Sequence, residues 1–176
     1  MGLDGWSSAA GRERWMRDEQ RAVADVRAAA GGAPALRIVV GENNSDLATT
    51  VSLLLESEPD MCCCTAVSSG EAVLNSVDVH APNAFILDLS LDDGPSLPVI
   101  AKLRARLPRA VIVVFTGYRN PMLTEQCLQA GANDVVVKTG DIDALIEALR
   151  RAAARTETQA SHSGRSAASA GASSLS

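Results

Sequence analysis

Acidic, hydroxyl and basic side chains follow four of the aliphatic runs in this sequence, at the point where each run ends. Glu42 and Asn43 follow the first run, Asp88 the third, Thr116 the fourth and Lys138 the fifth. Carboxylate and carbonyl oxygens are the hard ligands that suit Mg²⁺, and a lysine and a hydroxyl together can bind the oxygens of a phosphoryl group. An aspartate can itself accept a phosphoryl group as an aspartyl-phosphate. These residue types predict phosphoryl chemistry at a magnesium site.

Aliphatic runs alternate with amphipathic stretches, and these supply the elements that must position the five residues. We expect strands at 36–40, 61–67, 84–87, 110–115 and 135–137, and helices at 47–55, 70–76, 95–107, 122–130 and from 142 onward. Asn44 or Ser45 is the expected N-cap of the first helix. This alternation predicts a doubly wound five-stranded parallel sheet, an α/β fold with both faces covered by helices. The carboxyl ends of such strands share one rim, where ligands bind.

Other kinds of site lack their motifs. No G-x-x-x-x-G-K-[ST] or G-x-G-x-x-G follows the first strand, so nucleotide binding has no support. His80 and His162 lie away from the strand ends, which argues against histidine acid–base catalysis. The cysteines Cys62, Cys63, Cys64 and Cys127 contain no C-x-x-C, and we interpret the adjacent three as buried apolar residues, with a redox role as the alternative. Asp92 and Asp93 are interpreted as solvated loop residues.

The 176 residues fit one domain at 35–154 with two tails. Residues 1–34 form an N-terminal extension, partly helical or disordered, in which residues 12–30 predict a solvated helix or alternatively a dimerisation helix. Residues 155–176 are rich in Ser and Ala and are expected to be disordered. No apolar run approaches the ~20 residues of a membrane span, and no secretory signal is visible. We therefore expect a cytoplasmic location, and the net charge of −5 argues against nucleic-acid binding.

Four segments, in this order, resemble the receiver domain of bacterial two-component response regulators: 38–44 (IVVGENN), 85–94 (FILDLSLDDG), 113–117 (VVFTG) and 131–138 (GANDVVVK). The resemblance covers residues 36–154 and implies a flavodoxin-like fold with strand order 2-1-3-4-5. It implies that Asp88 accepts a phosphoryl group from a histidine kinase or phosphotransfer protein, that Thr116 is the switch hydroxyl and that Lys138 pairs with the phosphate. Glu42, Asn43, Asp88 and the backbone carbonyl of Ser90 would hold Mg²⁺.

The sequence departs from this family at three positions. Asn43 stands where a second acid is usual, and one charge against a dication is worth several kcal/mol at an effective dielectric constant of ~20. We therefore expect weak Mg²⁺ binding and slow phosphorylation. A one-residue slip that made Glu42 the direct ligand would need an insertion before Leu47. Val135 replaces the usual aromatic residue before the lysine, and Thr139 replaces the frequent proline after it.

The resemblance implies a signalling phosphoacceptor, not an enzyme, that assists its own phosphotransfer. It would signal to an output partner protein through helix 122–130, strand 135–137 and the last helix, and a homodimer is possible. No output domain is expected in the 22 residues after 154. One alternative is a phosphorylation-independent receiver that acts as an interaction module, which Asn43 and Val135 favour. Another is a flavodoxin-like cofactor binder, although residues 41–44 lack a phosphate-binding loop.

Overall fold

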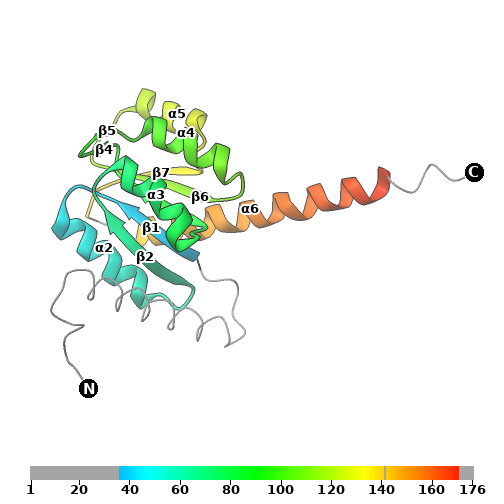
Figure 1. Cartoon of the computed structure of the whole chain (residues 1–176), viewed down its shortest axis with the longest axis horizontal. Coiled ribbons are helices and arrows are strands. Elements are labelled where there is room, and N and C mark those ends of the chain that lie inside the picture. The colour runs from blue at the N-terminus through cyan, green and yellow to red at the C-terminus, as the bar shows by residue number, and fades with distance from the viewer. Residues whose placement is uncertain (1–35, 141, 171–176) are drawn as a thin grey trace, which may run out of the picture.

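Five parallel strands form the central sheet of the computed structural model, which describes residues 36–140 and 142–170 (Figure 1). The strands are β1 (Leu36–Gly41), β2 (Met61–Val67), β3 (Ala84–Leu87), β6 (Val111–Thr116) and β7 (Asp134–Val137). Their order is β2-β1-β3-β6-β7. Counting only these strands, this is the expected order 2-1-3-4-5, so the predicted doubly wound fold is confirmed.

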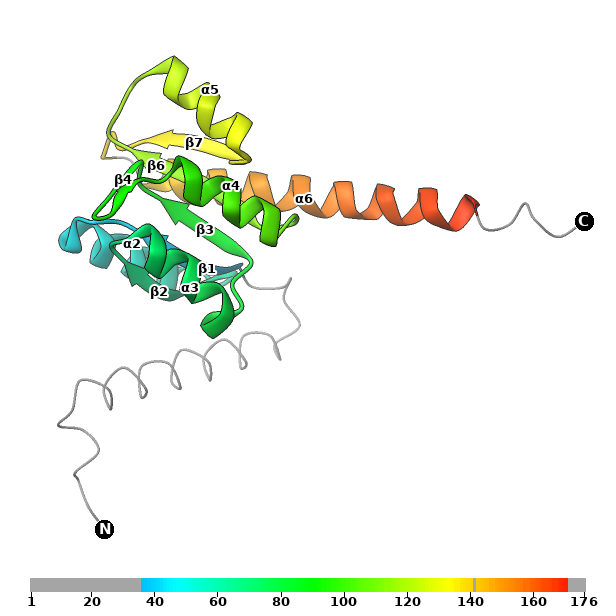
Figure 2. The ribbon, with the colours of Figure 1, turned by 45° about the horizontal axis from the view of Figure 1, so that its top comes forward.

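Helices cover both faces of this sheet (Figures 1 and 2). They are α2 (Ser45–Ser57), α3 (Gly70–His80), α4 (Leu97–Arg106), α5 (Pro121–Ala130) and α6 (Asp143–Ala170). Alternate residues of each strand point to opposite faces. Accordingly, Ile38 and Val40 pack with residues of α2 and α6, whereas Val39 packs with residues of α3, α4 and α5. Each fully buried aliphatic side chain contributes about 1.5–3 kcal/mol to folding, which fixes the register that positions the strand ends.

Side-chain caps set where the helices begin. Asn44 is the N-cap of α2, as predicted, and its Oδ1 accepts hydrogen bonds from the backbone N–H groups of Asp46 and Leu47. Asn120 caps α5 in the same way. Helix α3 continues to His80 rather than ending near residue 76, and Val77 in the added turn packs against the core.

A two-stranded antiparallel hairpin, missing from the sequence prediction, lies between β3 and α4. It pairs β4 (Ser90–Leu91) with β5 (Gly94–Pro95), and α4 therefore begins at Leu97 rather than at residue 95. Asp93, in its turn, accepts hydrogen bonds from the backbone N–H groups of Gly70 (2.7 Å) and Glu71 (2.9 Å). Asp93 is thus exposed in the turn, as interpreted from the sequence, and in addition its carboxylate caps the N-terminus of α3.

The described part of the chain extends beyond the predicted domain at its C-terminal end. Helix α6 continues past residue 154 to Ala170 and projects from the sheet (Figures 1 and 2), where the sequence predicted a disordered tail. The alanines and arginines of this stretch favour helix intrinsically, which composition-based disorder rules underweight. The predicted N-terminal extension and residues 171–176 lie outside the described residues. None of the described helices is both long enough and apolar enough to cross a membrane.

The three adjacent cysteines are buried in β2, as predicted. Cys62 and Cys64 pack with the α3–α5 side of the core, and Cys63 with the α2–α6 side. Burial raises the pKa of the Cys63 thiol to about 11. A hydrogen bond with the Cys62 side chain, together with burial, raises the pKa of the Cys64 thiol. The thiols of Cys63 and Cys64 therefore remain protonated near neutral pH, and all three side chains pack as small apolar groups.

Candidate functional site

Backbone hydrogen bonds of the sheet bring the predicted site residues to one rim. The N–H of Asp88 donates to the carbonyl of Gly41 (2.8 Å), immediately before Glu42. Between β6 and β7, the N–H of Lys138 donates a hydrogen bond to the carbonyl of Thr116 (2.7 Å). The strand pairs β1–β3, β3–β6 and β6–β7 are all parallel, so these residues leave the sheet at the same end.

Lys138 joins the two carboxylates at this rim. Its Nζ lies 2.6 Å from Glu42 Oε2 and 2.9 Å from Asp88 Oδ2. Glu42 and Asp88 are 6% and 9% exposed, respectively. Carboxylates withdrawn from water in this way need a compensating charge, and one ammonium group serves both. The three groups carry a net charge of −1 when all are ionised, so the site remains attractive to a cation.

Both carboxylates are also fixed by the backbone beside them. The second oxygen of Asp88, Oδ1, accepts a hydrogen bond from the N–H of Leu89 (2.7 Å). Glu42 Oε1 accepts one from the N–H of Asn44 (3.1 Å), the residue that caps α2. Each carboxylate therefore has one oxygen on Lys138 and one on the main chain, an arrangement that restricts its rotation.

Phe115 is a site residue that the sequence prediction missed. The Nζ of Lys138 lies 5.6 Å from the centre of its ring, within the range of a cation–π interaction. The ring packs in the core on the α2–α6 side of the sheet. The available signal was strand alternation, because Phe115 precedes Thr116 and must face the side opposite to it.

The Thr116 hydroxyl is buried at the end of β6, with Thr116 only 1% exposed. Its Oγ1 accepts a hydrogen bond from the N–H of Tyr118 (3.2 Å). A hydroxyl keeps its own proton for donation while it accepts, so Thr116 can still donate to an anion at this rim. The Tyr118 side chain is exposed beside it.

Of the remaining predicted metal ligands, Asn43 is exposed on the loop that follows β1, and Ser90 is exposed at the start of β4. Asn43 directly follows Glu42, and Ser90 lies two residues after Asp88. Carboxylate, amide and carbonyl oxygens are of the type that Mg²⁺ accepts with several waters. Across the described residues, no three side chains of the His, Cys, Asp and Glu types gather to hold a metal ion. The oxygen ligands offered by Glu42, Asn43, Asp88 and Ser90 are nevertheless of the kinds that Mg²⁺ accepts. Because residue 43 is an asparagine, the site has one carboxylate fewer than a fully acidic site.

The two other departures flank Lys138. Val135 pairs with Val114 of β6 and packs against the α3–α5 side of the core. Its N–H bonds to the Asp134 side chain (2.9 Å). After Lys138, Thr139 is exposed, and Gly140 has a φ of 88°. An aliphatic residue at 135 thus fills the core without an aromatic ring that could change rotamer.

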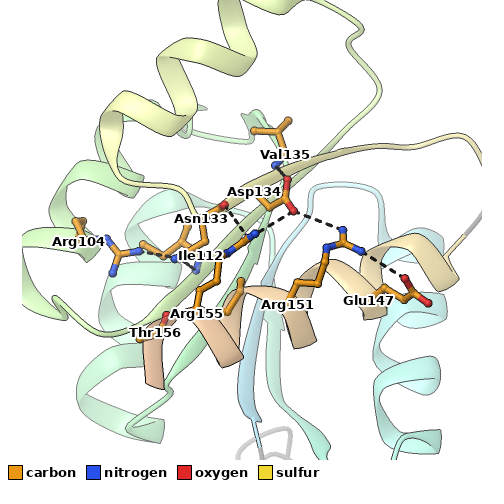
Figure 3. A network of polar contacts seen from close by, with 10 residues as sticks. Arg104, Ile112, Asn133, Asp134, Val135, Glu147, Arg151, Arg155 and Thr156 are labelled. Atoms are coloured by element: carbon orange, nitrogen blue, oxygen red, sulfur yellow. Dashed lines mark hydrogen bonds and ion pairs between the residues drawn. The ribbon is translucent and has the colours of Figure 1, made fainter. Parts of the chain in front are cut away.

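A polar network fixes the opposite end of β7 (Figure 3). Asn133 Oδ1 accepts hydrogen bonds from the Arg104 guanidinium and from the N–H of Ile112, both at 2.8 Å. Asp134 pairs with Arg151 at 3.6 Å and with Arg155 at 3.9 Å. These contacts connect α4, β6 and α6 to the start of the strand that ends at Lys138.

Comparison with known proteins agrees with this fold. The family model described as the response regulator receiver domain matches residues 38–150. An uncharacterized transcriptional regulatory protein of Bacillus subtilis, YvfU, is 26% identical over 116 residues, covering 66% of this chain and 58% of its own. The photosynthetic apparatus regulatory protein RegA of Rhodobacter capsulatus is 37% identical over 83 residues, covering 47% of this chain and 44% of its own. The chain therefore spans about half the length of these relatives.

Solved structures support the fold. A LuxR-family DNA-binding response regulator from Staphylococcus aureus superposes with a TM-score of 0.63 at 19% identity, over 67% of this chain and 98% of that one. NtrX of Brucella abortus, in complex with ATP, gives 0.66 at 22% identity, over 73% of this chain and 29% of that one. At these identities the likeness concerns the arrangement of strands and helices.

Proposed function

The chain belongs to the family of response regulator receiver domains, and from this membership we propose that it accepts a phosphoryl group on Asp88 in a two-component phosphorelay. The observation that carries the proposal is the contact of one lysine, Lys138, with both Glu42 and Asp88 at the carboxyl rim of the sheet. Each of these groups has a role in the transfer of a phosphoryl group to a carboxylate.

In the proposed transfer, a carboxylate oxygen of Asp88 attacks the phosphorus of a phosphohistidine on a histidine kinase or phosphotransfer protein. A P–O bond forms as the P–N bond breaks, and the electron pair of that bond returns to the imidazole nitrogen. The Lys138 ammonium, already 2.9 Å from Asp88, then pairs with a phosphoryl oxygen. The buried Thr116 hydroxyl donates to another phosphoryl oxygen.

Glu42, Asn43, Asp88 and the carbonyl of Ser90 would hold Mg²⁺. When bound, the ion supplies positive charge that offsets the negative phosphoryl oxygens. Because Asn43 contributes an amide in place of a carboxylate, we expect binding to be weak and phosphorylation slow.

The phosphorylated state would be passed to a partner protein through the surface of α5, β7 and α6. The added charge draws Lys138 and Thr116 toward Asp88, and the loop at Tyr118 follows because its N–H is bonded to Thr116 Oγ1. We further propose that the protein can form a homodimer and that it is located in the cytoplasm.

A second candidate function is a receiver that works without phosphorylation, as an interaction module. Asn43 favours it by lowering the charge available for Mg²⁺. Val135 favours it because it lacks the ring that could change rotamer on activation. In this case partner binding would be independent of Asp88.

Intact mass spectrometry after incubation with acetyl phosphate and Mg²⁺ distinguishes the two. We expect a species heavier by one phosphoryl group in the wild type and in the control Asp92→Ala. Asp92 is an exposed aspartate two residues after Ser90, and it is not among the proposed ligands. The species should be absent in Asp88→Ala. No adduct in the wild type, with partner binding unchanged in Asp88→Ala, would support the interaction module.

A further inference from the structure

A hollow of about 330 Å³ opens at the rim of the sheet opposite to Asp88. It is lined by the residues before β3 and by those between α4 and β6: Pro82, Asn83, Arg106, Leu107, Pro108, Arg109 and Ala110. The wall is mostly apolar, and its size falls at the lower end of the roughly 300–1,000 Å³ usual for small-molecule sites. None of the residues proposed to act in phosphoryl transfer lines it.

The hollow is preformed, because hydrogen bonds from Arg104 hold the backbone that lines one of its walls. The Arg104 guanidinium donates to the carbonyls of Pro108 (2.8 Å) and Ala110 (2.9 Å). The same group holds the carbonyl of Gly131 (2.8 Å) and, as Figure 3 shows, the side chain of Asn133. A ligand would meet walls that are already ordered, which lowers the entropic cost of binding.

The other wall is equally constrained. Asn83 and Arg37 exchange two hydrogen bonds: the Arg37 N–H donates to Asn83 Oδ1 (2.8 Å), and the Asn83 N–H donates to the Arg37 carbonyl (3.1 Å). The N–H of Val111 donates to the carbonyl of Asn83 (2.9 Å). Pro82 and Pro108 add two residues with fixed φ.

The charge of the hollow is opposite to that of the chain. Two arginines and no acidic residue line it, although the chain has a net charge of −5. Arg106 is held by Asp78 at 2.8 Å. Arg109, at the other side, is exposed at the edge of the apolar wall. An apolar surface edged by a guanidinium suits a molecule with an apolar tail and an anionic head.

We propose that this hollow binds a small amphiphilic carboxylate, with its tail against Leu107, Pro82 and Pro108 and its head at Arg109. The inference is independent of the phosphoryl-transfer proposal, because the two sites share no residue. The apolar contacts supply most of the affinity, and Arg109 selects the sign of the head group.

Titration of the full-length, ¹⁵N-labelled protein with octanoate tests the proposal by NMR. We expect saturable shifts at the amides of Asn83, Leu107, Arg109 and Ala110. Octan-1-ol, which has the same tail without the charge, should bind more weakly, and octylammonium more weakly still. Shifts centred elsewhere, shifts that do not saturate, or equal affinity for the three head groups would overturn the proposal.

Two charge reversals complete the test. Arg109→Glu should weaken octanoate binding about tenfold, as expected when an ion pair is replaced by repulsion, and should leave octan-1-ol binding unchanged. Lys102→Glu reverses an exposed charge on α4 that does not line the hollow, and it should leave both affinities unchanged. Equal losses of octanoate affinity in the two variants would contradict the proposal that Arg109 binds the head group. If the same amides shift on dilution of the unliganded protein, a second copy of the chain occupies the hollow instead.

Discussion

Lys138 Nζ lies 2.6 Å from Glu42 Oε2, although 96 residues separate the two in the chain. This distance is shorter than the 2.9 Å between the same ammonium and Asp88 Oδ2. Glu42 and Asp88 therefore share one cation, and in the proposed transfer a phosphoryl group on Asp88 would compete with Glu42 for it. In that proposal, Glu42 would affect the transfer through Lys138 as well as through any bound metal.

Replacing Lys138 by methionine should destabilise the fold, because two buried carboxylates lose their common cation. Removing one partner of a fully buried pair costs about 3–5 kcal/mol. The Lys138 and Asp88 side chains are 18% and 12% exposed, so we expect roughly 2–3 kcal/mol. Urea unfolding at pH 7 measures the change, with Lys102→Met as the exposed control. An unchanged midpoint in Lys138→Met would show that water already compensates the carboxylates.

Asn43→Asp should restore a second acidic side chain beside Glu42 and tighten Mg²⁺ binding by about tenfold or more, since it adds a full charge close to the ion. Isothermal titration calorimetry with MgCl₂ measures this affinity. Ser45→Asp adds the same charge two residues farther along, at the start of α2, and should have a smaller effect. Equal gains from both variants would mean that only the net charge of the rim matters.

The cap formed by Asp93 predicts a pH-dependent contribution to stability. Hydrogen bonds from the N–H groups of Gly70 and Glu71 lower the pKa of Asp93 below its ordinary value of 3.8. The contribution is therefore fully present above pH 3.8 and is lost as the pH falls through the lowered native pKa. Asp93→Asn should lower the free energy of unfolding at pH 7, and its difference from the wild type should narrow toward pH 3.

Denaturant titrations at several pH values measure that difference for Asp93→Asn. The matched control is Asp92→Asn, the neighbouring exposed aspartate of the same turn. A difference for Asp93→Asn that stays constant across this pH range would contradict the role of its charge.

The four cysteines should resist alkylation in the folded protein. Burial raises the pKa of Cys63 to about 11, so about one thiol in a thousand is ionised at pH 8, and all four cysteines are buried. Iodoacetamide at pH 8 should modify none on the timescale in which all four react in guanidinium chloride. Leu53→Cys, at a position that is 67% exposed, serves as the reactive control. Rapid labelling of Cys63 in the native state would indicate local opening of β2.

Hydrophobic periodicity was enough to predict the sheet strands and their helices. The aliphatic runs that contain Ile38, Phe85 and Val113 are buried and nearly continuous, as central parallel strands are. The strand order came from family resemblance, because pairing between distant strands leaves no mark in local sequence. The polar residues that follow four of the five runs then predicted the rim that carries Asp88 and Lys138.

The sequence did not predict the features that depend on contacts between residues far apart in the chain. The β4–β5 hairpin has two residues on each side, too few for a period to be visible. Asp93 caps a helix that begins 23 residues before it, and no local motif encodes such a contact. Phe115 approaches Lys138 only because β6 and β7 pair. The prediction that Asn43 weakens Mg²⁺ binding stays a prediction.

Strand β6 begins at Val111, next to the hollow, and ends five residues later at Thr116, a span of roughly 17 Å. That span exceeds twice the Debye length of about 8 Å at physiological ionic strength. A carboxylate seated at Arg109 would thus act only weakly on Asp88 through the solvent. Communication between the two ends of the molecule would then depend mainly on displacement along the strand itself.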